Sequence, residues 1–300
     1  MKRADIKVGF ACNNHCKFCV QGDKRLHYKQ RSFEEIKKIL ENEYKNGCKG
    51  VVFTGGEPTL HKDLIASVLY ARNLGYNILQ IQSNGRNFSN KEYVKELIHA
   101  GVTEFGPSIH GFKKETHDIL VGSPGAWEQV IQGIKNLREL KQNIIINSVI
   151  TKQNYTEIPA LALLLCKLGV SQFQFAFVHI LGSAEKNKKE IVPTKTEIIP
   201  YIKKALDIGK KYNVICMTEA IPFCLMQGYE WAIAEYNFMP ETTVIDAEYR
   251  TESYNDYRWS EGKAKGENCK KCLKNKVCEG PWKEYPELYG WDEFIPINDE

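Results

Sequence analysis

Short apolar runs alternate with longer amphipathic runs along most of the first 217 residues. The apolar runs have the length and β-branched content of buried strands. These expected strands cover 6–11, 50–54, 77–82, 103–109, 144–150, 173–178 and 214–217. The amphipathic runs predict helices over 32–45, 60–74, 90–100, 127–140, 156–168 and 196–212. Ser32 and Glu35 have the spacing of a capping box at the start of the first of these helices.

This strict alternation predicts an α/β fold with a parallel sheet and right-handed crossovers. It fits either a doubly wound sheet or a full or partial (β/α) barrel, and periodicity does not choose between them. In both folds the active site lies at the carboxyl ends of the strands. The unusual residues of the chain follow expected strands in this way: Cys12, Gly55-Gly56-Glu57-Pro58, Ser83-Asn84-Gly85, Ser108 and His110.

The alternation stops after about residue 218, where the chain becomes rich in Tyr, Trp, Glu and Pro. A second group of cysteines lies in this part. We therefore expect two units, a main domain over 1–217 and a C-terminal extension over 218–300 with its own metal site.

Composition excludes several classes of protein. Hydrophobic residues make up 43% of the 300 residues, which is enough for a substantial core. The net charge of +4, from 41 Lys and Arg against 37 Asp and Glu, is small for a dedicated nucleic-acid binder. The start of the chain is charged, and no apolar run approaches the roughly 18 residues of a membrane span. We expect a cytoplasmic protein without membrane or nucleic-acid partners.

The chain has ten cysteines, and in a reducing compartment closely spaced cysteines indicate metal rather than disulfides. Cys12, Cys16 and Cys19 have the spacing C-x3-C-x2-C. Three thiolates on one loop can bind three irons of a cubane and leave the fourth iron open for chemistry. The alternative is a structural zinc site with His15 as the fourth ligand, although no second cysteine knuckle lies nearby in the sequence.

This cysteine spacing, with Phe18 before the third cysteine and Gly55-Gly56-Glu57-Pro58 after the second expected strand, resembles the radical S-adenosylmethionine (SAM) superfamily. The resemblance covers residues 5 to about 217. It implies a partial (β/α)6 TIM-like barrel and a [4Fe–4S] cluster on Cys12, Cys16 and Cys19. It also implies that SAM binds the open iron and is cleaved reductively to a 5′-deoxyadenosyl radical, which abstracts a substrate hydrogen atom.

The resemblance further implies a set of SAM contacts. These are Gly55, Gly56, Glu57, Pro58, Ser83, Asn84, Ser108 and Asn147. The two glycines would let the backbone approach the methionyl ammonium, and Glu57 would orient that group or the loop. Ser108 and Asn147 would reach the ribose or carboxylate. His110 is either a substrate-site residue or a structural histidine, and Ile109 and Val149 either flank the adenine or belong to the core. No residue is assigned to the substrate chemistry itself.

The late cysteines Cys269, Cys272 and Cys278 have the spacing C-x2-C-x5-C. The pattern resembles the SPASM and twitch auxiliary-cluster segments of radical SAM enzymes. Cysteines are too few for a full SPASM extension, so we expect one auxiliary [4Fe–4S] cluster of twitch type. We choose Cys224 as its fourth ligand over Cys216, which lies in a strand-like run. A zinc knuckle completed by Cys224 is the alternative, and without Cys224 the open iron could bind substrate.

Two substrate classes remain open. One is a ribosomally made peptide, and the other is a small molecule in a cofactor pathway, as in the molybdopterin-pathway radical SAM proteins. The first expected strand begins near residue 6, so we expect no N-terminal peptide-binding domain; a separate recognition protein or the barrel would bind a peptide. An electron donor such as flavodoxin or ferredoxin is implied. A non-catalytic iron–sulfur or zinc protein is the non-enzyme alternative.

Overall fold

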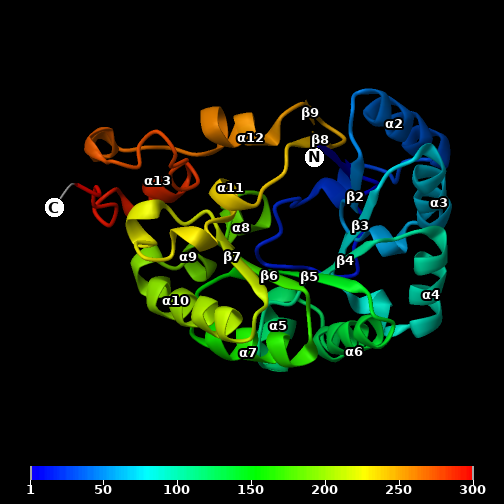
Figure 1. The fold of residues 1–300 in the computed structure, drawn as a ribbon, viewed down its shortest axis with the longest axis horizontal. Coiled ribbons are helices and arrows are strands. Elements are labelled where there is room, and N and C mark those ends of the chain that lie inside the picture. The colour runs from blue at the N-terminus through cyan, green and yellow to red at the C-terminus, as the bar shows by residue number, and fades with distance from the viewer. Residues whose placement is uncertain (1, 299–300) are drawn as a thin grey trace.

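Strands β1 to β7 lie side by side in chain order, each parallel to its neighbours (Figure 1). The computed structural model describes residues 2–298. The full sheet order is β7-β6-β5-β4-β3-β2-β1-β8-β9. The strands are β1 (Arg3–Lys7), β2 (Gly50–Thr54), β3 (Ile78–Ser83), β4 (Glu104–Pro107), β5 (Asn143–Ile150), β6 (Gln172–Phe177), β7 (Ile215–Glu219), β8 (Thr242–Ile245) and β9 (Arg250–Thr251).

Helices cover the outer surface of this curved sheet (Figure 1). The longer ones are α2 (Phe33–Lys45), α3 (Leu64–Leu74), α4 (Lys91–Ala100), α5 (Lys114–Val121), α6 (Ala126–Glu139), α7 (Ile158–Leu168) and α10 (Lys195–Lys211). The short ones are α1 (Lys24–His27), α8 (Ser183–Lys186), α9 (Lys188–Ile191), α11 (Ala234–Asn237), α12 (Tyr254–Tyr257) and α13 (Tyr285–Tyr289). The expected capping box of Ser32 and Glu35 is present at the start of α2.

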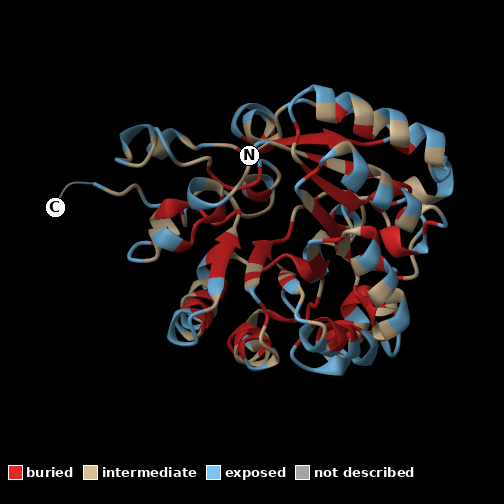
Figure 2. Ribbon diagram, turned by 45° about the vertical axis from the view of Figure 1, so that its right-hand side comes forward, coloured by how far each residue is buried: buried red, intermediate tan, exposed pale blue. Residues whose placement is uncertain are grey.

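The hydrophobic core fills the layer between the sheet and these helices. Every second residue of a strand points outward into this layer. Ile6, Phe53, Ile81 and Phe105 are such residues, and each is fully buried. The strands are accordingly buried while the outer faces of the helices are exposed (Figure 2). The expected α/β fold with a partial TIM-like barrel is confirmed, with parallel strands in chain order as its main body.

Some expected boundaries are wrong. The first strand covers Arg3–Lys7 rather than 6–11, because the polar residues Arg3 and Asp5 face the inside of the barrel and are paired with β2. The expected helix 60–74 is two elements, a 3₁₀ turn at Pro58–Leu60 and α3. Helix α5 and strand β8 were not expected at all.

The last 80 or so residues pair with both edges of the barrel sheet. Strand β8 pairs in parallel with β1, and β9 pairs antiparallel with β8. Thr218 at the other edge of the sheet forms a bridge with Ile233. The chain between β7 and β8 thus crosses the open side of the barrel. Among residues 2–298, no helix has the length and apolar character needed to cross a membrane.

Candidate functional site

Cys12, Cys16 and Cys19 lie on the loop that follows β1, and all three line a cavity of about 420 Å³ at the carboxyl ends of the strands. The thiols are close neighbours: burial, followed by the charges of Cys19 and Cys12, raises the pKa of Cys16. Three mutually close thiols in a partly buried loop are a donor set that suits a multi-iron cluster with one open position. The residues present therefore fit the expected group.

Three hydrogen bonds to its backbone groups hold the cysteine loop, each from a different element. His15 N donates to Val121 O at 2.8 Å at the end of α5, and Ser183 N donates to Cys19 O at 2.8 Å. The Arg86 guanidinium, after β3, donates to Asn13 O at 2.6 Å. The loop is thus held in place by the polypeptide itself.

Gly55 and Gly56 pack against the chain that enters this loop. Gly56 N donates to Gly9 O at 2.8 Å, and Glu57 N donates to Ala11 O at 2.8 Å. A Cβ atom on Gly56 would lie 2.3 Å from Phe10 O. Gly55 and Gly56 line the cavity as well, so the close approach they permit is first of all between two backbone segments of the protein.

Glu57 ties the loops after β2 and β3 together. Its Oε1 accepts from Thr59 N at 3.0 Å and from the Ser83 hydroxyl at 2.7 Å, and its Oε2 accepts from Asn84 N at 2.7 Å. Burial raises the pKa of Glu57, while these hydrogen bonds favour the charged form. These contacts join two loops, which is one of the two roles expected for Glu57. Glu57 and the buried Pro58 do not line the cavity.

The other expected SAM contacts all line the same cavity: Ser83, Asn84, Ser108 and Asn147. Asn84 Nδ2 donates to Asn13 Oδ1 at 2.6 Å and so reaches the cysteine loop. Ser108 and Asn147 are paired as a bridge between neighbouring strands. Asn147 Oδ1 is buried and has no partner within residues 2–298, which marks it as a group that a ligand would satisfy.

His110 lines the cavity beside Phe18, with ring centroids 4.6 Å apart. Its Nδ1 accepts from Val149 N at 3.0 Å, and burial lowers its pKa well below the ordinary range. The imidazole is therefore neutral, with its proton on Nε2. Val149 also lines the cavity, whereas Ile109 is fully buried and does not.

A second cavity is lined by four cysteines from separate parts of the C-terminal region: Cys224, Cys269, Cys272 and Cys278. Burial and the charges of the other three cysteines raise the pKa of Cys224 to about 12. Cys48, Cys166 and Cys216 are buried elsewhere in the core. Within residues 2–298, no three His, Cys, Asp or Glu side chains converge as ligands of a single metal ion.

Lys263 lies in a lysine-rich stretch of the sequence, yet its side chain is not solvated. It is buried, ion-paired with Glu235, and lies 3.2 Å from Glu279. Arg258 binds Glu279 through two contacts of 3.0 Å. The two cations of this cluster are thereby matched by two carboxylates.

Glu219, at the end of β7, lies beside this cluster. Its Oε2 accepts a hydrogen bond from Gln174 Nε2 at 2.5 Å. It lines the cavity of the first cysteines. Burial and the charge of Glu235 raise the pKa of Glu219 to about 7. Trp282, four residues after Cys278, lines the same cavity and stacks on His179 with centroids 3.8 Å apart.

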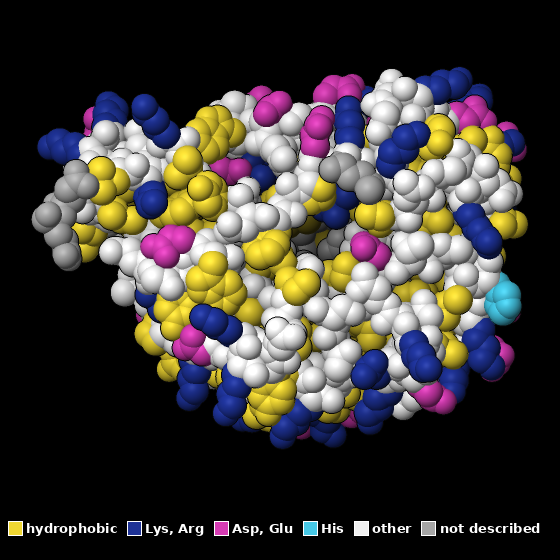
Figure 3. Space-filling model, in the orientation of Figure 1, with side chains coloured by type: hydrophobic (Ala, Val, Ile, Leu, Met, Phe, Trp, Pro, Cys, Tyr) yellow, Lys and Arg dark blue, Asp and Glu magenta, His cyan; other side chains and the backbone are white. Residues whose placement is uncertain are grey.

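A larger cavity of about 570 Å³ continues down the inside of the barrel. The same face is hollowed at its centre in Figure 3. Gln82, Asn147 and Glu219 line both cavities, so the two are continuous. Sequence reasoning missed this polar lumen. Its signal is the alternation of glutamine with apolar residues in β3 and β6, whose strands are covered by helices on their outer face.

Comparisons with known proteins point to one family. A sequence model of the Radical SAM superfamily matches residues 6–165. The chain is 31% identical to the Fe-coproporphyrin III synthase of Methanosarcina barkeri over 60% of its length and 44% of that protein's. It is 31% identical to a probable GTP 3′,8-cyclase of Saccharolobus solfataricus, covering 66% and 64%. It is 28% identical to the PqqA peptide cyclase of Bradyrhizobium diazoefficiens, covering 64% and 50%. The chain thus spans between 44% and 64% of the length of these relatives.

Solved structures share the fold over nearly the whole chain. Streptococcus suis SuiB, bound to the precursor peptide SuiA, aligns with 99% of this chain and 75% of its own, at a TM-score of 0.67 and 18% identity. The protein anSMEcpe with bound AdoMet aligns with 94% of this chain and 90% of its own, at a TM-score of 0.68 and 16% identity.

Proposed function

Because this chain belongs to the radical SAM superfamily, we propose that Cys12, Cys16 and Cys19 bind a [4Fe–4S] cluster and that SAM binds its open iron. The observation that carries the proposal is the shared cavity, which these thiols, Gly55 and Asn147 line together. Bound there, the pair supplies reductive cleavage of the SAM sulfonium bond and a 5′-deoxyadenosyl radical for hydrogen abstraction.

The protein's own groups bind and orient SAM. The unpartnered Asn147 Oδ1 accepts from a ribose hydroxyl, the Ser108 hydroxyl contacts the ribose or carboxylate, and Val149 packs on the adenine. Glu57 acts through the loops it joins rather than on SAM. Neutral His110 offers one N–H toward the cavity, which suits a hydrogen bond to a ligand.

We propose that residues 218–300 form a twitch-like segment with a second [4Fe–4S] cluster held by Cys224, Cys269, Cys272 and Cys278. The support is that these four thiols, far apart in the sequence, all line one cavity. The apolar walls from Phe223 and Phe294 would keep water from such a cluster.

For the substrate we propose a ribosomally synthesised peptide. The relative named as PqqA peptide cyclase and the shared fold of SuiB, which binds its precursor peptide, support this class. A small molecule of cofactor biosynthesis is the second candidate, because the relatives named as Fe-coproporphyrin III synthase and probable GTP 3′,8-cyclase are the more similar in sequence.

We further propose a cytoplasmic location and a flavodoxin or ferredoxin as electron donor. None of the ten cysteines, all within the described residues, is in a disulfide, which fits a reducing compartment. A separate recognition protein would then present a peptide to the barrel.

The test is anaerobic reconstitution with iron and sulfide, followed by dithionite and SAM. We expect 5′-deoxyadenosine and methionine from the wild type and none from Cys16→Ala. The variant with Cys12, Cys16 and Cys19 all changed to Ala should retain about four irons per chain on the second site. Equal 5′-deoxyadenosine formation by the wild type and Cys16→Ala, or none by either, would overturn the proposal.

A further inference from the structure

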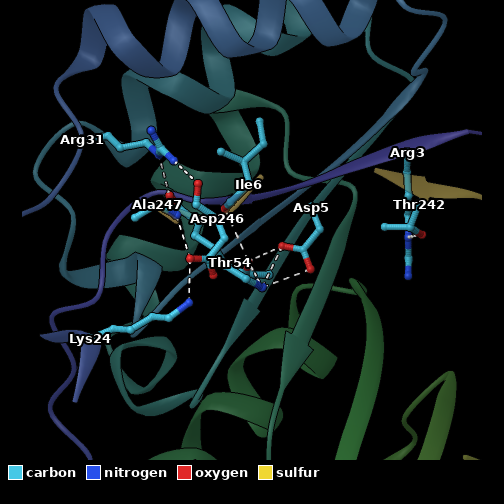
Figure 4. Close-up of polar contacts among 10 residues, drawn as sticks. Arg3, Asp5, Ile6, Lys24, Arg31, Thr54, Thr242, Asp246 and Ala247 are labelled. Carbon is cyan, nitrogen blue, oxygen red and sulfur yellow. Dashed lines mark hydrogen bonds and ion pairs between the residues drawn. The ribbon is translucent and has the colours of Figure 1, made fainter. Parts of the chain in front are cut away.

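Arg3 differs from the other cations that line the lumen of the barrel. Its Nε donates to the Thr242 hydroxyl at 3.0 Å, and no carboxylate of residues 2–298 lies within 4.0 Å of its guanidinium. Figure 4 shows Arg3 beside Thr242, apart from the group of contacts around Asp5. Four of its five N–H groups are therefore left for another partner.

The remaining lumen cations are all matched by carboxylates. Lys7 lies 3.0 Å from Asp5, Lys24 lies 2.7 Å from Asp246 (labelled in Figure 4) and Arg258 binds Glu279. Arg3 is thus the cation of this lining without an ion pair among residues 2–298.

Arg3 lines the lumen and is half-buried, and burial lowers the pKa of its guanidinium. A guanidinium that is partly removed from water without a carboxylate partner costs free energy. Its planar fork of donors matches the two oxygens of a carboxylate or phosphate group. An anionic group in the lumen would satisfy the donors that the protein leaves free.

The carboxyl groups near Arg3 do not occupy it. Asp5 is bonded to Lys7 and Thr54. Glu104 lines the same cavity without an ion pair, and burial raises its pKa, as it does for Glu219 at the upper end. The competing interpretation is that Arg3 and Glu104 form an ion pair bridged by a water molecule.

Space and polarity above Arg3 suit an elongated ligand. Gly50 and Gly106 line the lumen without side chains, and Gln80 and Gln82 present carboxamides that can donate and accept. Arg3 and Lys7 are four residues apart on β1, which is about 13 Å along a strand. A ligand that reaches from the upper cavity to Arg3 spans at least this distance.

We propose that the lower lumen is a substrate subsite in which Arg3 binds an anionic group, a carboxylate or a phosphate, of the molecule whose reacting carbon lies in the upper cavity. That the occupant is the substrate rests on the proposed function. The anion site itself rests on the geometry of Arg3.

The test uses the full-length reconstituted protein and three probes: glutarate, pyrophosphate and the neutral isostere glutaramide. Affinity is measured by isothermal titration calorimetry for the wild type, Arg3→Gln and the control Lys2→Gln. We expect glutarate or pyrophosphate, but not glutaramide, to bind the wild type and Lys2→Gln, with at least about tenfold weaker binding to Arg3→Gln. Preference for glutarate identifies a carboxylate, and preference for pyrophosphate identifies a phosphate.

Binding of neither anion to the wild type, or equal binding to Arg3→Gln, would overturn the subsite. If Arg3→Gln does not fold, the same titrations are made with Glu104→Gln and Arg3→Lys. Under the proposal Glu104→Gln binds the anion at least as tightly as the wild type, and Arg3→Lys binds it more weakly. A water-bridged Arg3–Glu104 pair predicts no anion binding in the wild type. Anion binding without 5′-deoxyadenosine formation would refute the proposed function and leave the subsite standing.

Discussion

The Ser83 hydroxyl donates a hydrogen bond to Glu57 Oε1 across 2.7 Å, which joins the turn after β2 to the turn after β3. The same carboxylate accepts from the Asn84 backbone, and Asn84 in turn contacts the cysteine loop through Asn13. One buried acid thus positions two of the loops that surround the cavity. We propose that its role is to hold the site in shape.

Glu57→Gln should destabilise the protein and weaken SAM binding. The amide keeps the size of the side chain, but its NH2 group would face a backbone or hydroxyl donor that is now left unsatisfied. We expect a loss of about 3 kcal/mol in the free energy of unfolding and at least tenfold weaker SAM binding. Urea unfolding and equilibrium dialysis measure these, with the exposed Glu92→Gln as the control. Wild-type SAM affinity in Glu57→Gln would refute this role.

Gly56→Ala should prevent stable loading of the first cluster. The added methyl would lie 2.3 Å from Phe10 O, so the chain that leads into Cys12 must shift. We expect iron content to fall toward about four per chain, the amount of one remaining cluster. Gly106→Ala is the control, since its nearest neighbour would lie at 3.3 Å. Unchanged iron content in Gly56→Ala would show that the close packing is not needed.

Cys224 and Cys216 provide a matched pair for the second site. Cys224 lines the cavity of the late cysteines, whereas Cys216 is buried in β7 beside Gly209. Cys224→Ala should lose or destabilise the auxiliary cluster, and Cys216→Ala should keep it. Iron analysis and electron paramagnetic resonance of the reduced proteins measure the difference. The assignment of Cys224 fails if the two variants hold the same cluster.

Glu219 should make the stability of the protein depend on pH near neutrality. Its folded pKa of about 7 lies above the ordinary 4.5, so the native state binds the extra proton between these values. The free energy of unfolding should therefore fall as pH rises from about 4.5 to about 7, by an amount on the order of 3 kcal/mol. The free energy of unfolding of Glu219→Gln should not fall in this way, so the variant should become more stable relative to the wild type as pH rises. Urea unfolding across this range, with the exposed Glu115→Gln as control, measures it; parallel wild-type and Glu219→Gln curves would contradict it.

Sequence patterns located most of the barrel because its helices and central strands carry strong local signals. The expected strand 50–54 coincides with β2, whose five residues are all buried and mostly β-branched. Gly75 and Gly101 end α3 and α4 in left-handed conformations, as a C-cap glycine does.

Elements whose stability comes from distant partners were missed or given wrong bounds. β8 is only four residues long and is a strand because it pairs with β1, far away in the chain. β1 itself alternates polar and apolar residues, and its polar side faces a lumen that no local pattern reveals. Tertiary context decided both cases.

The candidate site shows the same division. The spacing of Cys12, Cys16 and Cys19 was enough to place them together, because they share one short loop. The unpaired state of Arg3 and the burial of Lys263 depend on side chains from several elements. Neither could be read from the neighbouring residues along the chain.

The pairing of β1 with β8 also bears on how the protein is made. β1 receives one neighbour from residues 50–54 early in synthesis, but its other neighbour emerges only with residues 242–245. Contacts of such sequence separation form late, because a long loop must close first. During synthesis, one edge of β1 therefore has no hydrogen-bonding partner and can pair with a wrong strand. The three thiols that follow β1 can be oxidised in the same period. We expect the cluster to be inserted after the chain leaves the ribosome, and the free edge of β1 to be covered by another protein until β8 pairs with it.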